Sequence, residues 1–330
     1  MTDEPKPLAV TVDELRKRAE AKQPKPLTDA QRKLLEHSAN IFGELATKKD
    51  AAYLPRELVQ ITLPHKNPGN VPAWTRTNGN LSVTIRPGWN DAQQQPYGYP
   101  YGSIPRLLLF WITTEAVQKK SRRLELGHSL SSFMTNLGLN NSNGSSGAKR
   151  SDARRLRDQM ERLFRAQISF NPLDRKAWLD MQVAPLGEFW WDQRQPEQSV
   201  LWGSWIELGE KFFDAIIAFP VPADLRALRA LKGSALKLDL YTWLNYEAFR
   251  AHTSGKARFE NWTQLHAHLG AEYSDIGDFR RKAKAALREI KTVYPSLKLG
   301  DRMGGVDVLP ESWPAIRPKN ITIDGVCKGL

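Results

Sequence analysis

The stretch SDIGDFRRKAKAALREIKTVY, residues 274–294, has the pattern of a helix with one apolar and one basic face. Its apolar residues recur at three- and four-residue spacing and share one stripe: Ile276, Phe279, Ala283, Ala286, Leu287, Ile290 and Tyr294. A second stripe beside it is basic: Arg280, Arg281, Lys284, Arg288 and Lys291. We expect Asp278 and Glu289 to project to another side and leave this stripe unpaired. The pattern favours a helix that binds a polyanion; an ordinary solvated charged face is the alternative.

The residues around this helix predict where it begins, where it ends and which element comes next. Ser274 or Asp275 can cap its start, and Pro295 ends it. Two short apolar runs, 297–299 and 306–309, flank the turn GDRMGG at 300–305, which is the pattern of a hairpin. A basic helix followed by a hairpin is the ending of a winged helix. In that fold we expect Lys298 and Arg302 of the hairpin to meet the DNA backbone.

The composition describes a folded, basic protein. Of 330 residues, 41% are hydrophobic and 25% charged, which excludes global disorder. Lys and Arg outnumber Asp and Glu by 48 to 36, so the formal net charge is +12 and a polyanionic partner is favoured. The sequence has no apolar run of membrane-spanning length and no apolar signal region, so we expect a cytoplasmic protein without a membrane partner. Cys327 is the one cysteine, which excludes an internal disulfide and a cysteine-cluster zinc site.

The order of predicted elements occurs twice along the chain. The first set has a helix from Ser103 to Lys120, a strand at 124–126, a helix capped by Ser129, a basic helix at 151–164, and extended segments at 166–170, 178–183 and 186–191. After residues 219–222 (FPVP), Pro222 opens a helix, and further helices follow at 234–252 and 262–269 before the basic helix. Asn261 and Gln264 form a capping pair for the helix at 262–269. This predicts an α+β, mainly α, fold with two tandem winged-helix domains.

These boundaries divide the chain into three parts. Residues 1–50 carry Lys-Pro pairs and two modestly amphipathic segments, 12–22 and 29–45, and are interpreted as a loosely attached arm that is partly helical or flexible. Residues 51–219 are the first winged-helix domain, expected to mediate dimerisation and an auxiliary DNA contact. The domain opens with runs at 58–63 and 81–85 that predict a hairpin. Residues 220–330 are the second domain, expected to be the principal DNA-binding unit.

The two basic helices differ in how their charges are distributed. In the first, Asp158 and Glu161 are spaced to pair with arginines at i,i+4: Arg154/Asp158, Arg157/Glu161, Asp158/Arg162 and Glu161/Arg165. Much of that charge is consumed locally, so Arg154 and Arg155 are assigned an auxiliary DNA contact. In the second helix, Arg281, Lys284 and Arg288 are expected to face the groove. Lys149 and Arg150 follow a polar loop and either reach a phosphate or end a solvated loop.

Two other features invite a different function. The motif His266-Ala267-His268 resembles the metal motif of nucleases that nick DNA through a tyrosine, but on a helix the two imidazoles point about 200° apart. With no Walker motif, dinucleotide motif or metal-spaced acid cluster, we expect no metal, no cofactor and no enzyme. Stacking on single-stranded DNA is the other possibility for the eleven tryptophans. Most lie in apolar runs typical of a core, whereas one of the adjacent pair Trp190 and Trp191 is expected to be exposed.

Several blocks of the sequence resemble the RepA family of replication initiators from broad-host-range plasmids. The blocks are YGSIPRLLLFWITTEA (101–116) and LELGHSL (124–130), followed by LRDQMERLF (156–164), PVPADLRAL (220–228) and LDLYTWL (238–244). They occur in the family's order, and the resemblance covers about residues 55–315. No motif places the arm before residue 50.

The resemblance implies a function without catalysis. Such an initiator binds directly repeated sites (iterons) in double-stranded origin DNA, helps to open adjacent DNA and recruits host replication proteins such as the host initiator and helicase. It also implies that dimers repress the protein's own gene while monomers bind the repeats, with the first winged helix forming the dimer. A transcriptional repressor of the same fold is the alternative, and a nicking enzyme dependent on His266 and His268 is a third class.

Overall fold

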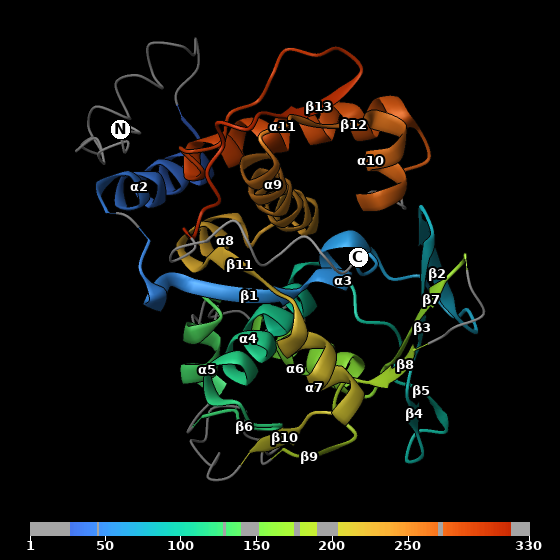
Figure 1. Ribbon diagram of the computed structural model, residues 1–330. Helices are drawn as coiled ribbons and strands as arrows, with labels where there is room; N and C mark the ends of the chain where they lie inside the picture. The colour runs from blue at the N-terminus through green and yellow to red at the C-terminus, as the bar shows by residue number, and fades with distance from the viewer. Residues whose placement is uncertain are drawn as a thin grey trace.

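A computed structural model describes residues 27–44, 46–127, 130–139, 152–174, 179–189, 204–269 and 273–317. These residues form a mixed α and β structure in which helices predominate (Figure 1). Among them, no helix combines the length and apolar character that crossing a membrane requires. The segment 12–22, the cap Ser129, the pair Lys149 and Arg150, and Cys327 lie outside the described residues.

The elements fall into two sets along the chain. The first set comprises α2 (Asp29–Gly43), η1 (Lys48–Asp50), β1 (Ala51–Pro55), α3 (Arg56–Gln60), β2 (Trp74–Asn78), β3 (Leu81–Arg86), β4 (Trp89–Asn90), β5 (Gln95–Pro96), α4 (Ser103–Lys119), β6 (Arg123–Glu125), α5 (Leu130–Asn136), α6 (Asp152–Phe164), β7 (Gln167–Pro172), β8 (Leu179–Gln182), β9 (Leu186–Glu188) and β10 (Trp205–Glu207). The second set comprises α7 (Glu210–Ala218), β11 (Pro220–Asp224), α8 (Leu225–Leu231), α9 (Ala235–Ser254), β12 (Arg258–Asn261), α10 (Trp262–Leu269), α11 (Ile276–Val293) and β13 (Gly305–Val308).

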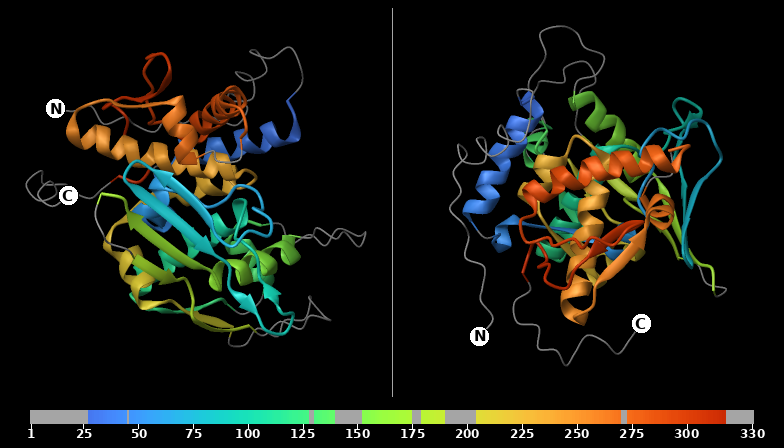
Figure 2. Two further views of the ribbon diagram at one scale, coloured as in Figure 1. Left: turned by 90° about the vertical axis from the view of Figure 1, so that its right-hand side faces the viewer. Right: turned by 90° about the horizontal axis from the view of Figure 1, so that it is seen from above.

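All strand pairs are antiparallel, and they form small sheets around the helices. The largest has the order β2-β3-β7-β8 and lies along one side of the molecule (Figure 2, left). A three-stranded sheet, β6-β10-β9, lies at the end of the first set. At the opposite end, β12 pairs with β13, and Leu299 adds a bridge to Val308 (Figure 1).

The two sets are joined by one short ladder between β1 and β11. Its register runs from Ala51↔Asp224 to Pro55↔Pro220 and is centred on the pair Tyr53↔Pro222. In Figure 1 this ladder crosses the middle of the molecule, with α9 and α11 above it and α4 and α6 below. A boundary at residues 219/220 therefore falls at the first residue of a strand that pairs with the other half.

Each set follows the same order of elements. A helix leads into a strand, a short helix, a long helix, a strand and two more helices, and paired strands follow: α2-β1-α3-α4-β6-α5-α6 and α7-β11-α8-α9-β12-α10-α11. The first set carries additional strands, β2 to β5 between α3 and α4, and β7 and β8 after α6. The leading helices are exchanged: α2 packs against α8 and α11 of the second set, whereas α7 packs against α4 and β1 of the first.

For the described residues 27–44 of the expected arm, which contain a helix as predicted, the packing of α2 corrects the expectation of a loose attachment. Thr28 caps α2 with a complete capping box, and α2 buries Leu34, Ala39 and Ile41. The Ser38 hydroxyl also donates to the carbonyl oxygen of Thr292 at the end of α11. Sequence favoured an arm because the segment is strongly charged, but its narrow apolar stripe finds a partner far along the chain.

Two further expectations about local structure are wrong. The run at 58–63 is not a strand of a hairpin, since Leu58 and Val59 lie in α3, and β3 pairs instead with β2. Pro222 does not open a helix but lies in β11, and Asp224 caps α8 by accepting from the backbone N–H of Arg226 at 2.9 Å. At Pro222 the ladder between β1 and β11, which joins residues about 170 apart, overrides the local signal.

The long helices were predicted correctly. α4 and α9 occupy the expected ranges, α9 with Ser234 as its cap. The Asn261–Gln264 capping pair of α10 is confirmed: the Asn261 side-chain oxygen accepts from the backbone N–H of Gln264 at 2.9 Å. Both long helices bury residues around most of their circumference, because they lie between the β1–β11 ladder and other helices. Such helices form the centre of a shared core.

A buried ion cluster joins these two long helices. Arg106 of α4 makes a bidentate pair with Asp239 of α9, with Nε–Oδ1 and Nη2–Oδ2 distances of 2.6 and 2.7 Å. His65 contacts the second carboxylate oxygen through Nε2 at 2.9 Å. The guanidinium also donates to the carbonyl oxygens of Leu63 (2.7 Å) and Gly102 (2.6 Å). All three side chains are at least nine-tenths buried.

The carboxylate of Asp239 stays charged because of its partners. Burial by itself would raise the pKa of Asp239, but the Arg106 charge and hydrogen bonds from His65 and Arg106 hold that pKa well below its usual range. A carboxyl group with a lowered pKa in the folded state stabilises the fold above its ordinary pKa, and this stabilisation is lost as the pH falls toward the folded-state value. The cluster therefore holds the two halves together at neutral pH.

We expect Asp239→Asn to lower the free energy of unfolding by about 3–5 kcal/mol, because it leaves the Arg106 charge buried without a counter-ion. The matched control is Glu115→Gln on α4, the helix of Arg106, which removes the partner of Lys119 from an exposed pair and should cost about 0–1 kcal/mol. Denaturant unfolding at neutral pH measures both. Equal losses for the two variants would contradict a central role for the cluster.

Candidate nucleic-acid interface

The helix α11 is held in place by its apolar face. Asp275 caps it by accepting from the backbone N–H of Asp278 at 2.9 Å, and backbone hydrogen bonds from Gly277 and Asp278 lower the pKa of Asp275. Of the predicted apolar stripe, Phe279, Ala283, Ala286, Ile290 and Tyr294 are buried, and Val293 joins them, whereas Leu287 is only partly buried and Ile276 is 40% exposed. The buried face packs against α9, α10 and α2. Seen from above, α11 crosses over α9 on the outside of the molecule (Figure 2, right).

The opposite face of α11 is exposed and basic. Every cation of the predicted stripe has an exposed side chain: Arg280, Arg281, Lys284, Arg288 and Lys291. Lys282 is also exposed but does not belong to the stripe, because at 100° per residue it projects about 100° from Arg281 and lies on the side of Glu289. Arg288 lies near the middle of the exposed face, opposite the buried stripe. Ala285 is exposed beside it, which leaves room for close approach of another molecule.

One expectation about this stripe is wrong. Arg281, whose side chain is 73% exposed, forms an ion pair with Asp278 across the first turn of α11. Projection at 100° per residue separates these two by only about 60°, so the spacing i,i+3 brings them together. Glu289 takes a partner from outside the helix, Lys237 of α9. Asp278, the acidic residue nearest the exposed face, thus pairs with Arg281, whereas Glu289 is directed toward α9.

The hairpin after α11 adds two of the predicted cations. The side chain of Lys298 is exposed, and the guanidinium of Arg302 lies 4.0 Å from the ring centroid of Phe259 on β12. The ammonium of Lys284 on α11 lies 6.0 Å from the ring centroid of Trp262, the first residue of α10. In Figure 1, α11, β12 and β13 lie together at the top of the molecule. The structure thus brings the C-terminal site residues to one end of the fold.

The histidine motif has structural partners. His266 contacts the carbonyl oxygen of Tyr273 through Nε2 at 3.1 Å, and His268 contacts that of Val59 at 2.9 Å. The ring of His268 also lies 3.5 Å from Glu260. The two imidazoles thus serve separate contacts, and the described residues contain no group of three or more potential metal ligands.

The basic helix of the first half, α6, is more fully paired. Arg155 pairs with Asp152 and Arg162 with Asp158, each at 3.1 Å, and only the second of these was predicted. Burial and the neighbouring Asp158 charge raise the pKa of Glu161, against the charges of Arg165 and Arg157, which lower that pKa. Arg154 and Arg155 are exposed, whereas Arg162 packs inward near Tyr101. The two basic helices therefore present different charge to solvent.

The aromatic residues are mostly structural. Trp243 and Trp262 are buried as expected, whereas Trp111 and Trp205 are partly exposed. Trp205 lies under the guanidinium of Arg123 at 4.0 Å. Trp178, Trp190 and Trp191 lie outside the described residues. The sequence analysis did not single out Trp89, which is 55% exposed on the small hairpin β4–β5.

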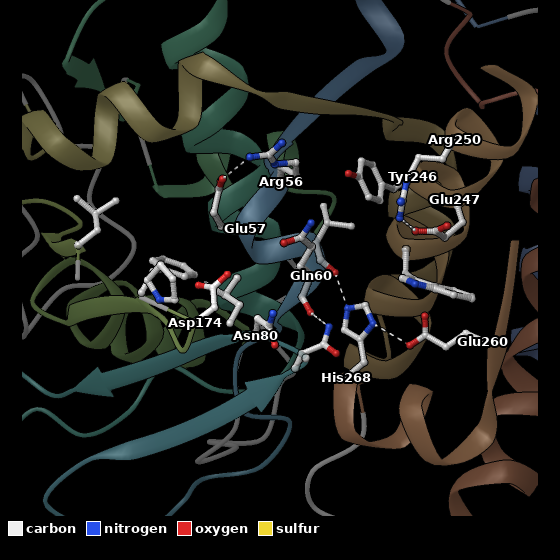
Figure 3. A pocket seen from close by; sticks show the side chains of 18 residues that line it. Arg56, Glu57, Gln60, Asn80, Asp174, Tyr246, Glu247, Arg250, Glu260 and His268 are labelled. Atoms are coloured by element: carbon white, nitrogen blue, oxygen red, sulfur yellow. Dashed lines mark hydrogen bonds and ion pairs between the residues drawn. The ribbon is translucent and has the colours of Figure 1, made fainter. Parts of the chain in front are cut away.

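A cleft of about 850 Å³ lies between the two halves (Figure 3). It is lined from α3, the β3 and β7 strands, α9 and α10, and its walls carry charges of both signs. Glu247 pairs with Arg250 at 2.9 Å and with Arg258 at 3.0 Å. Glu57 and Glu260 also face the cleft, so its electrostatics disfavour a polyanion and leave α11 as the candidate nucleic-acid interface.

The fold and this surface define a class: a protein with two modules of the same element order, one of which presents an exposed basic helix and a hairpin. A family model described as plasmid encoded RepA protein matches residues 99–264, half of the chain. The chain therefore belongs to the RepA family, the RepA-type plasmid replication initiators. No curated protein and no solved structure shows a significant match to this chain.

The family match does not reach α11, the helix of the candidate site. It begins shortly before α4 and ends within the first turn of α10. It therefore includes α6, β11 and the Arg106–Asp239 pair. It ends before α11 and before the turn at residues 300–305 that precedes β13. The role of α11 therefore depends on its own geometry and charge.

The Arg281–Asp278 pair provides a test of which cations of α11 contact DNA. Because Asp278 neutralises Arg281 locally, we expect the double variant Arg281→Ala/Asp278→Ala to bind duplex DNA within about twofold of the parent, whereas Arg288→Ala weakens binding several-fold. Asp278→Ala alone should strengthen binding. Fluorescence anisotropy with one labelled duplex at fixed salt measures all three, and a double variant as weak as Arg288→Ala would show that Arg281 contacts DNA itself.

Proposed function

We propose that this initiator binds directly repeated sites, or iterons, in the double-stranded DNA of a plasmid origin, with α11 as its principal DNA-binding element. The observation that carries the proposal is the exposed face of α11, where Arg280, Lys284, Arg288 and Lys291 line a helix with an apolar, well-packed back. A helix of this kind fits the major groove, where arginine reads guanine and other cations hold phosphates.

We infer that each module is a winged helix. The order helix, strand, helix, helix and paired strands supports this in both halves, with sheet orders β6-β10-β9 and β12-β13 plus the Leu299 bridge. The proposal then assigns α6 and α11 to equivalent positions. Two modules on one chain raise the effective concentration of each near its half of a repeat.

The modules have unequal duties in this proposal. The second supplies most of the affinity, and Lys298 and Arg302 contact the DNA backbone. The first assists through Arg154 and Arg155, with Lys149 and Arg150 as further candidates, and forms a homodimer in equilibrium with the monomer. Exposed Leu179 on the edge strand β8 and Leu186 on β9 support a protein contact on this half.

The initiator role extends to other partners. We propose that binding to the repeats promotes opening of the adjacent origin DNA and recruits host replication proteins such as the host initiator and helicase. Binding by the dimer to an operator would repress the protein's own gene and so contribute to copy control. These steps require positioning of DNA and proteins and no cofactor or catalytic group of this chain.

Salt dependence tests the assignment of α11. We expect Lys284→Ala/Arg288→Ala/Lys291→Ala to abolish protection of the repeats in a footprint, because it removes three outward charges. The slope of log K against log salt should fall by about 0.9 for each phosphate that the variant no longer neutralises. Lys119→Ala, an exposed lysine of α4 that pairs with Glu115, is the control and should leave the slope unchanged. An unchanged footprint in the triple variant would refute the assignment.

A replication assay separates an initiator with these activities from a repressor that only binds an operator. The gene is cloned with its flanking DNA on a vector that cannot replicate in the host. An initiator supports replication of this vector, and the triple variant does not. If the protein is only a repressor, neither the parent nor the triple variant supports replication, although both proteins fold and the parent binds DNA.

A further inference from the structure

The hairpin after α11, whose turn at residues 300–305 leads from Leu299 into β13, carries an apolar residue at its tip. Met303 is 85% exposed, the largest fraction among the exposed large hydrophobic side chains in the described ranges. Its neighbours in the turn are small or charged: Gly300, Asp301, Arg302, Gly304 and Gly305. An exposed methionine in such a turn contributes nothing to the core of the module.

The backbone that follows Met303 is held against β12 and the start of α10. Gly304 has a φ of +90°, a conformation that side chains rarely adopt, and its carbonyl oxygen accepts from the backbone N–H of Trp262 at 3.1 Å. A Cβ at Gly305 would lie 2.1 Å from the carbonyl oxygen of Glu260, so the turn approaches β12 too closely for any residue but glycine. The tip is therefore a rigid projection with a flexible apolar side chain at its end.

The hairpin's charge does not explain this projection. Lys298 and Arg302 are offset by Asp301 and Asp307 in the same hairpin. Arg302 is also drawn against Phe259. A hairpin without net positive charge gains little binding free energy from contacts to phosphates. An apolar contact at its tip would contribute the binding free energy that charge does not.

We propose that Met303 is a wedge that enters the minor groove of the duplex bound by α11 and partly unstacks one base step, kinking the DNA. The proposal rests on the proposed function of α11. Proteins that kink DNA insert apolar side chains, methionine among them, between base steps, and the unstacking costs a few kcal/mol. Methionine suits such a contact because it is unbranched and polarisable. Pyrimidine–purine steps unstack most easily, so the wedge would favour repeats with such a step beneath the hairpin.

The test compares DNA bending with DNA affinity. The probe is a duplex that carries one repeat from the DNA beside the gene, labelled at both ends for energy transfer, with 2-aminopurine at successive steps. We expect Met303→Ala to abolish most of the bend and the 2-aminopurine signal, while affinity changes by less than about tenfold because contact and unstacking offset each other. Met303→Leu should restore the bend. Leu173→Ala, which truncates a 58% exposed leucine at another turn, is the matched control.

The outcomes separate this proposal from the one on which it rests. If the triple variant of α11 loses binding but Met303→Ala bends DNA like the parent, the wedge is refuted and the function of α11 stands. If the triple variant binds normally, the proposed function fails first. The wedge is also overturned if the parent protein leaves the duplex straight. A Met303→Ala variant that changes only the oligomeric state in gel filtration would overturn it in favour of a protein contact at Met303.

Discussion

The arrangement of the two modules depends on a single buried ion cluster. Arg106 and Asp239 lie on the corresponding long helices α4 and α9, and their bidentate pair, extended by His65, is almost wholly removed from water. A buried pair of this kind contributes little net stability compared with apolar packing, but a wrong arrangement would leave either charge alone in the core at a cost of several kcal/mol. The cluster therefore selects one relative placement of α4 and α9. The β1–β11 ladder and the exchanged helices α2 and α7 complete that placement.

The same framework directs the two basic helices to different surroundings. The arginines of α6 meet Asp152 and Asp158 on their own helix, and Arg162 packs near Tyr101. On α11, Glu289 is drawn away by Lys237, which leaves Arg288 and its neighbours facing solvent. The contrast supports the proposed division of labour, in which one module holds the DNA and the other contributes contacts and dimerisation. The family match covers the Arg106–Asp239 pair of the framework, and the geometry of α11 supports the proposed DNA contact.

Most helices could be predicted because their signals are local. The apolar stripe of α11, the Ser234 cap of α9 and the Asn261–Gln264 pair of α10 each lie within a few residues of the structure they specify. Predictions failed where a distant partner decided the conformation. Pro222 has the position of a helix start but pairs with Tyr53, and the charged segment 29–43 packs on α8 and α11. The Arg281–Asp278 pair was missed although it is local, because a projection gives directions and not the reach of long side chains.

The sequence by itself determined most of the exposed and buried faces of α11, Ile276 at its start excepted, because helical periodicity assigns residues to faces without reference to the rest of the chain. It also determined the repeated order of elements and the family resemblance. Only the tertiary structure decided how the halves are joined, which cations are paired, and that Met303 projects from a fixed turn. The joining of the halves depends on contacts such as Arg106–Asp239 and Ser38–Thr292, between residues more than a hundred positions apart. No local pattern encodes them, since each partner's environment exists only after the chain has folded.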